Sequence, residues 1–150
     1  MSAARDKLAC RFLLACVLVI AAAWPVGQVQ AEDLQGTVTH VRDGDTIEVG
    51  NVPIRLNGLH APELGHPGGK RAATFMRDLV LHKAIICSLT GEKTYDRFVG
   101  TCWFDGADIA GELVAAGLGR DCPRYSGGRY AALERDSARS MSLPGYCKSR

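Results

Sequence analysis

The sequence lacks a surplus of charge in its larger part. The 150 residues carry 18 Lys and Arg against 16 Asp and Glu, and three of the basic residues and one acidic residue fall within residues 1–31. Residues 32–150 therefore carry 15 positive and 15 negative side chains. A strongly basic surface is the usual electrostatic mark of a nucleic-acid-binding domain. Composition gives no support for that class, so any such function must rest on a local group of residues.

The sequence also lacks an apolar run long enough to cross a bilayer. Its apolar segment from Phe12 to Trp24 has 13 residues, whereas a spanning helix needs about 20. Basic residues precede it, and Val29-Gln30-Ala31 has the small-residue spacing of a cleavage site. We interpret residues 1–31 as a signal peptide, not a membrane anchor, and residues 32–150 as one small domain. The mature protein is expected to be periplasmic or secreted, monomeric and free of the membrane.

A third absence is any Cys-x-x-Cys motif or clustered Cys/His pair, which disfavours a zinc site built on cysteine. Four cysteines lie beyond residue 31: Cys87, Cys102, Cys122 and Cys147. An even number in an exported domain predicts two disulfides, and three pairings are possible. We favour Cys87–Cys102, because adjacent antiparallel strands would bring these residues together. Cys122–Cys147 would then pin the C-terminal segment.

Apolar residues alternate in five short segments and follow a helical period in three others. The expected strands are 35–41, 46–49, 52–59, 84–89 and 99–104, and the expected helices are 70–81, 108–118 and 129–140. Internal repeats and low-complexity segments are absent. The order of elements predicts an α+β, mainly β domain, a five-stranded OB-fold barrel with three helices.

Charged residues gather at the ends of the first three expected strands. Asp45 stands where the first strand turns into the second, Arg55 lies in the third, and Glu63 follows it. Because a meander brings strand ends together, these side chains could share one rim of the barrel. A carboxylate there could hold a hard cation, an arginine could bind phosphate oxygens, and a second carboxylate could accept a proton from water. Solvated surface charge is the alternative interpretation.

Four motifs, in order, resemble the staphylococcal nuclease (thermonuclease) family: "DGDTI", "IRLNGLHAPE", "TYDRF" and "DGADIAGELVAAGL". The resemblance covers roughly residues 35 to 125. It implies an OB-fold and Ca²⁺-dependent cleavage of DNA and RNA. It also implies roles for single residues: Asp45 as a metal ligand, Arg55 as a catalytic phosphate-binding arginine, and Glu63 as the general base. Arg97 and Phe98 match positions that contact the nucleotide.

Two positions depart from the family pattern. His60 stands where the family has a second metal-binding aspartate, so we expect Asp45 and His60 as the metal ligands, with Zn²⁺ or Mn²⁺ as alternatives to Ca²⁺. Gly100 stands where the family has a second catalytic arginine. Loss of such a preorganised group can cost roughly 10²–10³ in rate. Arg97, Arg120 and Arg124 are the candidates to replace it.

Basic and aromatic residues also interleave at Arg124 and Tyr125, as a surface for nucleic acid requires. A segment held by the second disulfide explains this pattern equally well. The sequence therefore supports two functions. The first is an exported metal-dependent nuclease acting on DNA or RNA, with an activity that the two departures could reduce. The second is a catalytically inactive OB-fold module that binds nucleic acid or a protein partner. A disulfide-stabilised scaffold without a ligand is a weaker third interpretation.

Overall fold

The computed structural model describes residues 32–148, and the expected signal peptide lies outside them. The strands are β1 Glu32–Val41, β2 Thr46–Val49, β3 Val52–Leu56, β4 Leu59–His60, β5 Ala84–Thr94, β6 Arg97–Phe104, β7 Ala107–Asp108 and β8 Arg120–Asp121. The helices are α1 Gly69–Val80, α2 Ile109–Ala115, α3 Pro123–Ser126 and α4 Asp136–Arg139, with 3₁₀ turns η1 Ala131–Leu133 and η2 Gly145–Cys147.

Six strands form one sheet in the order β3-β2-β1-β5-β6-β7, and β4 pairs with β8 separately. A further, parallel pairing joins β3 to β6, with Arg55 opposite Val99. Each of the strands β1, β2, β3, β6 and β5 therefore pairs with the next, and β5 pairs with β1 again. The predicted class is confirmed: the domain is mainly β and OB-like, with more strands than the five expected.

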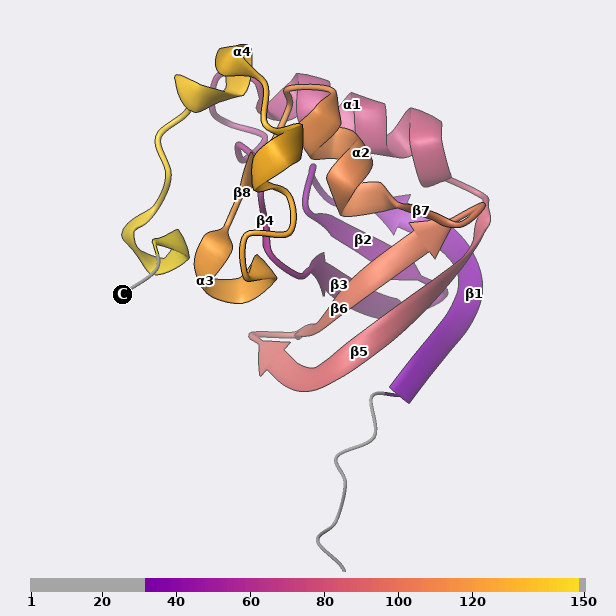
Figure 1. The fold of residues 1–150 in the computed structure, drawn as a ribbon. Coiled ribbons are helices and arrows are strands. Elements are labelled where there is room, and N and C mark those ends of the chain that lie inside the picture. The colour runs from indigo at the N-terminus through magenta and orange to yellow at the C-terminus, as the bar shows by residue number, and fades with distance from the viewer. Residues whose placement is uncertain (1–31, 149–150) are drawn as a thin grey trace, which may run out of the picture.

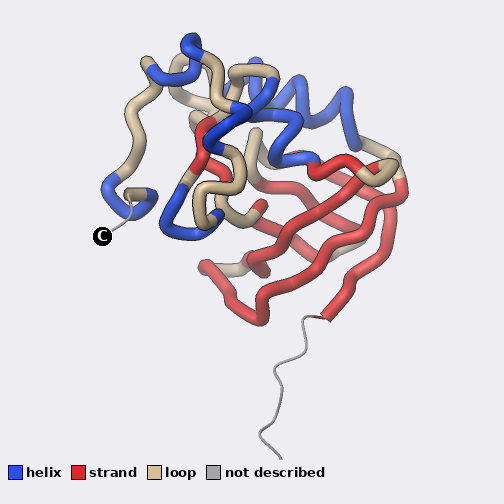
Figure 2. The backbone as a smooth tube through the Cα atoms, viewed as in Figure 1, coloured by secondary structure: helices blue, strands red, loops and turns tan. Residues whose placement is uncertain are grey.

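The core lies between the curved sheet and the first two helices. In β2 and β3, Ile47, Val49, Ile54 and Leu56 are buried, as alternation along half-buried strands requires. Helix α1 buries the stripe formed by Ala72, Ala73, Met76 and Val80. In Figure 1, α1 and α2 lie together above the strands, while α3, α4 and the C-terminus lie along one side. Figure 2 shows the same separation of helices from strands.

The expected strand 52–59 is divided in the structure. β3 ends at Leu56, and the chain turns at Gly58, which has φ of +74°. A Cβ at Gly58 would lie 2.5 Å from Ser126 Cβ, so only glycine fits this turn against α3. The turn directs Leu59 and His60 into β4 and away from the main sheet. It thereby places the residues after β4 beside the end of β3.

The expected strands 84–89 and 99–104 are both longer in the structure, where they form one extended hairpin. β5 continues to Thr94, which pairs with Arg97, and only Tyr95 and Asp96 form the turn. Tyr95 has φ of +57° and is almost fully exposed. The prediction was wrong because polar residues in an antiparallel pair still satisfy the backbone ladder when one face meets water.

The expected helix 129–140 is also wrong: η1 and α4 replace it, separated by extended backbone at Glu134. Tertiary hydrogen bonds hold this arrangement. Tyr130 donates its hydroxyl to Asp108 at 2.8 Å, and Glu134 accepts from the backbone N–H of Asp121 at 2.8 Å. Short helical propensity in a polar segment is readily overridden by such contacts.

Two disulfides join Cys87 to Cys102 and Cys122 to Cys147, the pairing favoured from sequence. Cys87 and Cys102 are directly opposite each other in β5 and β6. The second disulfide joins the residue before α3 to η2. Within residues 32–148, none of the helices has the length and apolar character of a membrane span.

The Cys87–Cys102 disulfide is expected to stabilise the hairpin. Replacing both residues with serine should lower the free energy of unfolding by about 2–4 kcal/mol, because the unfolded chain regains the freedom of the closed loop. Urea denaturation followed by circular dichroism measures this change. An unchanged midpoint and slope would show that the disulfide contributes nothing to stability.

Candidate functional site

One cleft of about 480 Å³ opens beside the junction of β3, β4 and the β5–β6 hairpin. It contains charged and aromatic side chains from segments far apart in sequence. Its lining comprises Arg55, Leu56, Asn57, Gly58, Leu59, Glu63, Glu92, Thr94, Tyr95, Arg97, Val99, Cys122, Tyr125 and Tyr146. The predicted pair Arg55 and Glu63 is therefore brought together. Two acidic and two basic side chains leave this lining without net charge.

Asp45 and Arg55 form an ion pair at the back of the cleft. Arg55 Nη1 lies 2.5 Å from Asp45 Oδ1, and the two side chains are only 16% and 3% exposed. The pairing of β2 with β3 sets this contact, because Thr46 lies opposite Arg55. The other oxygen, Asp45 Oδ2, faces the backbone N–H of Ala61 at 3.4 Å. The sequence-predicted neighbours Asp45 and Arg55 thus share one buried contact.

The Asp45 carboxyl has an unusual pKa. Burial raises this pKa from 3.8 to about 6, against the opposing effect of the Arg55 charge. The neighbouring Asp43 raises it further through its own charge and a side-chain hydrogen bond. Asp43 also accepts a hydrogen bond from the Asp45 backbone N–H at 2.9 Å and so stabilises the turn. The ionised form of Asp45 would be favoured by an additional positive charge beside it.

Glu63 is exposed at the edge of the cleft, and its backbone is held by the turn that leads into α1. His66 donates its backbone N–H to Glu63 O at 2.9 Å. A Cβ on Gly69 would lie 1.9 Å from that same carbonyl oxygen, so glycine is required for this close approach. The helix start therefore fixes where the Glu63 side chain enters the cleft.

Strand alternation separates the predicted pair Arg97 and Phe98. Arg97 and Val99 line the cleft, whereas Phe98 packs against the hydrophobic core. Arg97 Nη1 donates to Thr46 Oγ1 at 3.0 Å, next to Asp45. Side chains of successive strand residues point to opposite faces, so only Arg97 of the two is placed to meet a ligand in the cleft.

Gly100 lies on the core side of β6, like Phe98. A Cβ there would lie 3.0 Å from Leu89 Cδ2 and 3.1 Å from the Ser88 carbonyl oxygen. A side chain at this position would press against both neighbours, which would have to shift to admit it. Of the three candidates to replace it, Arg97 is the one that lines the cleft.

The other two candidate arginines have different partners. Arg120 contacts Glu134 at 3.3 Å and donates to the carbonyl oxygen of Met141 at 3.0 Å. Arg124 is exposed and lies over the ring of Tyr125, with its guanidinium carbon 5.7 Å from the ring centre. Tyr125 itself lines the cleft. The predicted surface at Arg124 and Tyr125 thus contributes its aromatic member to the cleft.

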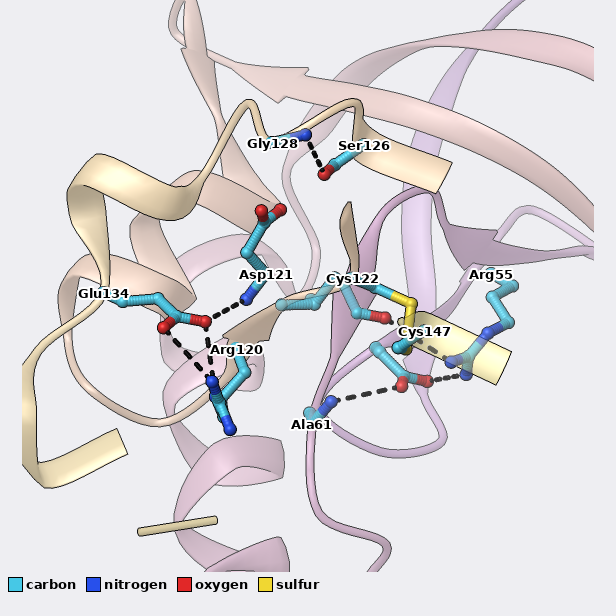
Figure 3. Close-up of a disulfide and its surroundings, with 11 residues drawn as sticks. Arg55, Ala61, Arg120, Asp121, Cys122, Ser126, Gly128, Glu134 and Cys147 are labelled. Atoms are coloured by element: carbon cyan, nitrogen blue, oxygen red, sulfur yellow. Dashed lines mark hydrogen bonds and ion pairs between the residues drawn. A yellow bond between two sulfur atoms is a disulfide. The ribbon is translucent and has the colours of Figure 1, made fainter. Parts of the chain in front are cut away.

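Sequence reasoning missed two aromatic residues of the cleft. Tyr95 lies in the turn of the β5–β6 hairpin, and Tyr146 is carried by η2 next to Cys147. Figure 3 shows the Cys122–Cys147 disulfide in the surroundings of Arg55. For Tyr146, the available signal was the favoured pairing of Cys147 with Cys122. Cys147 follows Tyr146 directly and Cys122 precedes Tyr125 by three residues, so this disulfide brings Tyr146 close to Tyr125.

His60 is half-buried between cationic groups. Burial lowers the pKa of its imidazole, and the charges of Arg55 and Arg120 lower it further. A hydrogen bond to the backbone of Ser142 opposes this shift, and the buried Nδ1 has no partner. A metal-binding role for His60 stays a prediction, and two nearby guanidinium groups are unfavourable neighbours for a cation.

The donor set at this site suits a hard cation. Within residues 32–148, no three His, Cys, Asp or Glu side chains lie together as metal ligands, which a protein-built zinc site would need. Asp45 offers a buried carboxylate whose ionisation a cation would favour. Mg²⁺ in particular is often bound through one or two carboxylates, with water and substrate phosphate oxygens as further ligands. Asp45, with Asp43 behind it, fits that mode.

The family model "Staphylococcal nuclease homologue" matches residues 53–140 of this chain. The match includes Arg55, Glu63 and Arg97 and ends before Tyr146. It covers more than half of the 150 residues.

Several curated proteins are similar to this chain. The succinoglycan biosynthesis protein ExoI of Rhizobium meliloti (strain 1021) is 34% identical over 116 residues, which is 69% of this chain and 60% of that protein. An uncharacterized endonuclease of Escherichia coli O157:H7 is 34% identical over 99 residues, or 63% of each chain. Protein ParB of Escherichia coli is 31% identical over 94 residues, covering 60% of this chain and 49% of ParB. The chain thus spans less than two thirds of these relatives.

The environment of His60 predicts a pH dependence of stability. Because its pKa is lowered in the folded state, the unfolded chain binds more protons as the pH falls below about 6.5, and stability is lost there. His60→Gln removes this titration. The comparison is made in EDTA, so that no metal is bound. Between about pH 7.5 and about pH 5.5, on either side of the ordinary histidine pKa of about 6.5, the free energy of unfolding should fall more in the wild type than in His60→Gln. Parallel urea-denaturation curves for the two proteins across this range would contradict the prediction.

Proposed function

Since this chain belongs to the staphylococcal nuclease homologue family, we propose that it is an exported, metal-dependent nuclease that hydrolyses phosphodiester bonds of DNA or RNA. The observation that carries the proposal is the meeting of Arg55, Arg97 and Glu63 in one open cleft. The uncharacterized endonuclease with which it shares 34% identity supports the same chemistry.

Arg55 and Arg97 are the proposed phosphate-binding residues. Guanidinium groups bind phosphate oxygens with paired, charge-assisted hydrogen bonds. Arg55 donates to Asp45 at 2.5 Å and to the Leu59 carbonyl oxygen at 3.5 Å. Arg97 donates to Thr46 at 3.0 Å and to the Thr94 carbonyl oxygen at 3.5 Å. Within residues 32–148, Arg55 Nε and Arg97 Nη2 have no hydrogen-bond partner, so these groups could bind the substrate. Arg97 would thereby take the place of the second catalytic arginine, which the family has at the position of Gly100.

Glu63 is the proposed general base. Its carboxylate lies at the exposed edge of the cleft, where water has access. Glu63 would accept a proton from a water molecule as the water oxygen bonds to phosphorus and the bond from phosphorus to the leaving oxygen breaks. The leaving oxygen takes its proton from solvent. The arginines would stabilise the negative charge that grows on the phosphate oxygens.

The charge balance of the site supports a need for a cation. Arg55 and Arg97 face Glu63 and Glu92 within the cleft, and Asp45 neutralises Arg55 from behind. The site without a metal therefore offers a phosphate little net attraction. A divalent ion held by Asp45 would supply positive charge to the phosphate oxygens. We assign Ca²⁺, Mg²⁺ or Mn²⁺ to this role ahead of Zn²⁺, since these ions accept oxygen ligands from water and phosphate.

Export is supported by two observations. The first is the signal-peptide pattern of residues 1–31, and the second is the pair of disulfides. Disulfides persist mainly in oxidising compartments. The periplasm or the extracellular medium is therefore the proposed location of the mature domain.

A non-catalytic binding module is the second candidate. It is favoured by the small number of acidic ligands: no third His, Cys, Asp or Glu completes a metal site in the described part of the chain. Such a module would use the same arginines and tyrosines to bind a strand without cleaving it. The two candidates differ only in hydrolysis, so one assay separates them.

Hydrolysis of single-stranded DNA and RNA by the purified protein tests the proposal, with Ca²⁺, Mg²⁺, Mn²⁺ and Zn²⁺ supplied separately. Glu63→Gln should lower kcat by roughly 10²–10⁴ through loss of the general base. Arg97→Gln should lower it by roughly 10²–10³ through loss of a phosphate-binding group.

The exposed residues Glu112 and Arg139 provide matched controls outside the cleft, since Glu112→Gln and Arg139→Gln make the same chemical changes there. Both should retain wild-type rates. Binding of nucleic acid without cleavage under every metal would favour the module, and equal rates for Arg97→Gln and the wild type would remove Arg97 from the mechanism.

Metal binding at Asp45 has a readout that is independent of activity. Adding Ca²⁺ or Mn²⁺ to the EDTA-treated wild type should raise Tm, because a ligand that binds only the folded state stabilises it. Asp45→Asn should abolish this rise, and Asp78→Asn, an exposed carboxylate on α1, should leave it intact. An equal rise in all three proteins would place the cation elsewhere.

A further inference from the structure

The last residues that the structure describes, 141–148, lie beyond the family match, which ends at residue 140. We call this segment the C-terminal tail. Two contacts hold it against the domain. Arg120 donates to the carbonyl oxygen of Met141 at 3.0 Å, and Cys147 is bonded to Cys122. The tail is therefore anchored near both of its ends.

The tail delivers an aromatic side chain to the cleft. Tyr146 is 49% exposed and lines the cleft together with Tyr125, which is 45% exposed. Cys147, next to Tyr146, and Cys122, three residues before Tyr125, are both buried. Cys122 itself forms part of the cleft wall, so the disulfide lies directly behind the surface that a ligand would meet.

The backbone around the disulfide is fixed to the strand that carries Arg55. Cys122 donates its backbone N–H to the carbonyl oxygen of Gly58 at 2.8 Å, at the turn that follows β3. Tyr125 donates its backbone N–H to Cys122 O at 2.9 Å. The position of Tyr146 relative to Arg55 thus depends on a short chain of contacts through Cys147, Cys122 and Gly58.

Half-exposed aromatic rings beside phosphate-binding arginines have a specific chemical use. Bases of single-stranded nucleic acids stack on such rings, whatever their sequence. Bases of a duplex are stacked on one another and are not free to do so. A strand whose phosphate is held by Arg55 would present its neighbouring base to the walls of the same cleft.

We propose that Tyr146 is a base-stacking residue for single-stranded nucleic acid, and that the C-terminal tail, held by Arg120 and the Cys122–Cys147 disulfide, places it there. This inference rests on the proposed function, since it names how that site holds its substrate.

Binding of a fluorescently labelled single-stranded oligothymidylate with Ca²⁺ present tests the proposal when each variant is made in the Glu63→Gln protein, which takes the place of the wild type here. Loss of the general base suppresses cleavage, so affinity alone is measured. Tyr146→Ala should weaken binding about tenfold, as expected for loss of one stacked base. Tyr146→Phe keeps the ring and should bind like the wild type. Ile86→Ala, an equally exposed apolar residue outside the cleft, should also leave affinity unchanged.

A second pair of measurements separates stacking from general disturbance. An abasic oligonucleotide of the same length offers phosphates without bases, so Tyr146→Ala and the wild type should bind it equally. The double variant Cys122→Ser/Cys147→Ser should lose the same affinity for oligothymidylate as Tyr146→Ala, and adding Tyr146→Ala to it should cause no further loss.

The outcomes distinguish the inference from the function beneath it. Wild-type affinity in Tyr146→Ala would overturn the role of the tail while leaving the nuclease proposal intact. Equal weakening on the abasic probe would also overturn stacking. If the wild type bound no single-stranded probe and cleaved none when metal was added, the proposed function and the inference would both fail.

Discussion

The buried ion pair between Asp45 and Arg55 is the contact on which the site depends. It joins the start of β2 to β3, and the second oxygen of Asp45 faces the backbone N–H of Ala61. One carboxylate thereby links the β1–β2 turn, β3 and the segment leading to Glu63. Burying this carboxylate is costly, as the raised pKa of about 6 shows. Removal of either partner would leave an uncompensated buried charge, so the pair gives the cleft one geometry.

The same pair explains why the cleft has little attraction for phosphate on its own. Arg55 is paired with the buried carboxylate of Asp45, and two acidic residues share the cleft lining with Arg97. Desolvation makes such arrangements sensitive to an added charge. A cation beside Asp45 and an anion beside Arg55 would each favour the other, which connects the proposed metal dependence to a structural cause and not only to family membership.

Much of the candidate site could be predicted because its residues are close in sequence. Asp45, Arg55 and Glu63 lie within nineteen positions, and short strands bring such neighbours together. The separation of Arg97 from Phe98 could not be predicted with the same assurance, since it depends on which face of β6 meets the core. The expected helix at 129–140 failed for a related reason: Tyr130 and Glu134 bond to residues that are distant in the chain, and these contacts outweigh local propensity.

The sequence by itself determined the mainly β class, the membership suggested by four ordered motifs, and the even set of cysteines that favours two disulfides. These features are written in local patterns of polarity, spacing and residue type. The tertiary structure decided that Gly100 faces the core, that Arg97 shares the cleft with Arg55, and that Tyr146 reaches the same cleft from the end of the chain. Strand register and long-range contacts set the direction of each side chain, and no local pattern contains that information.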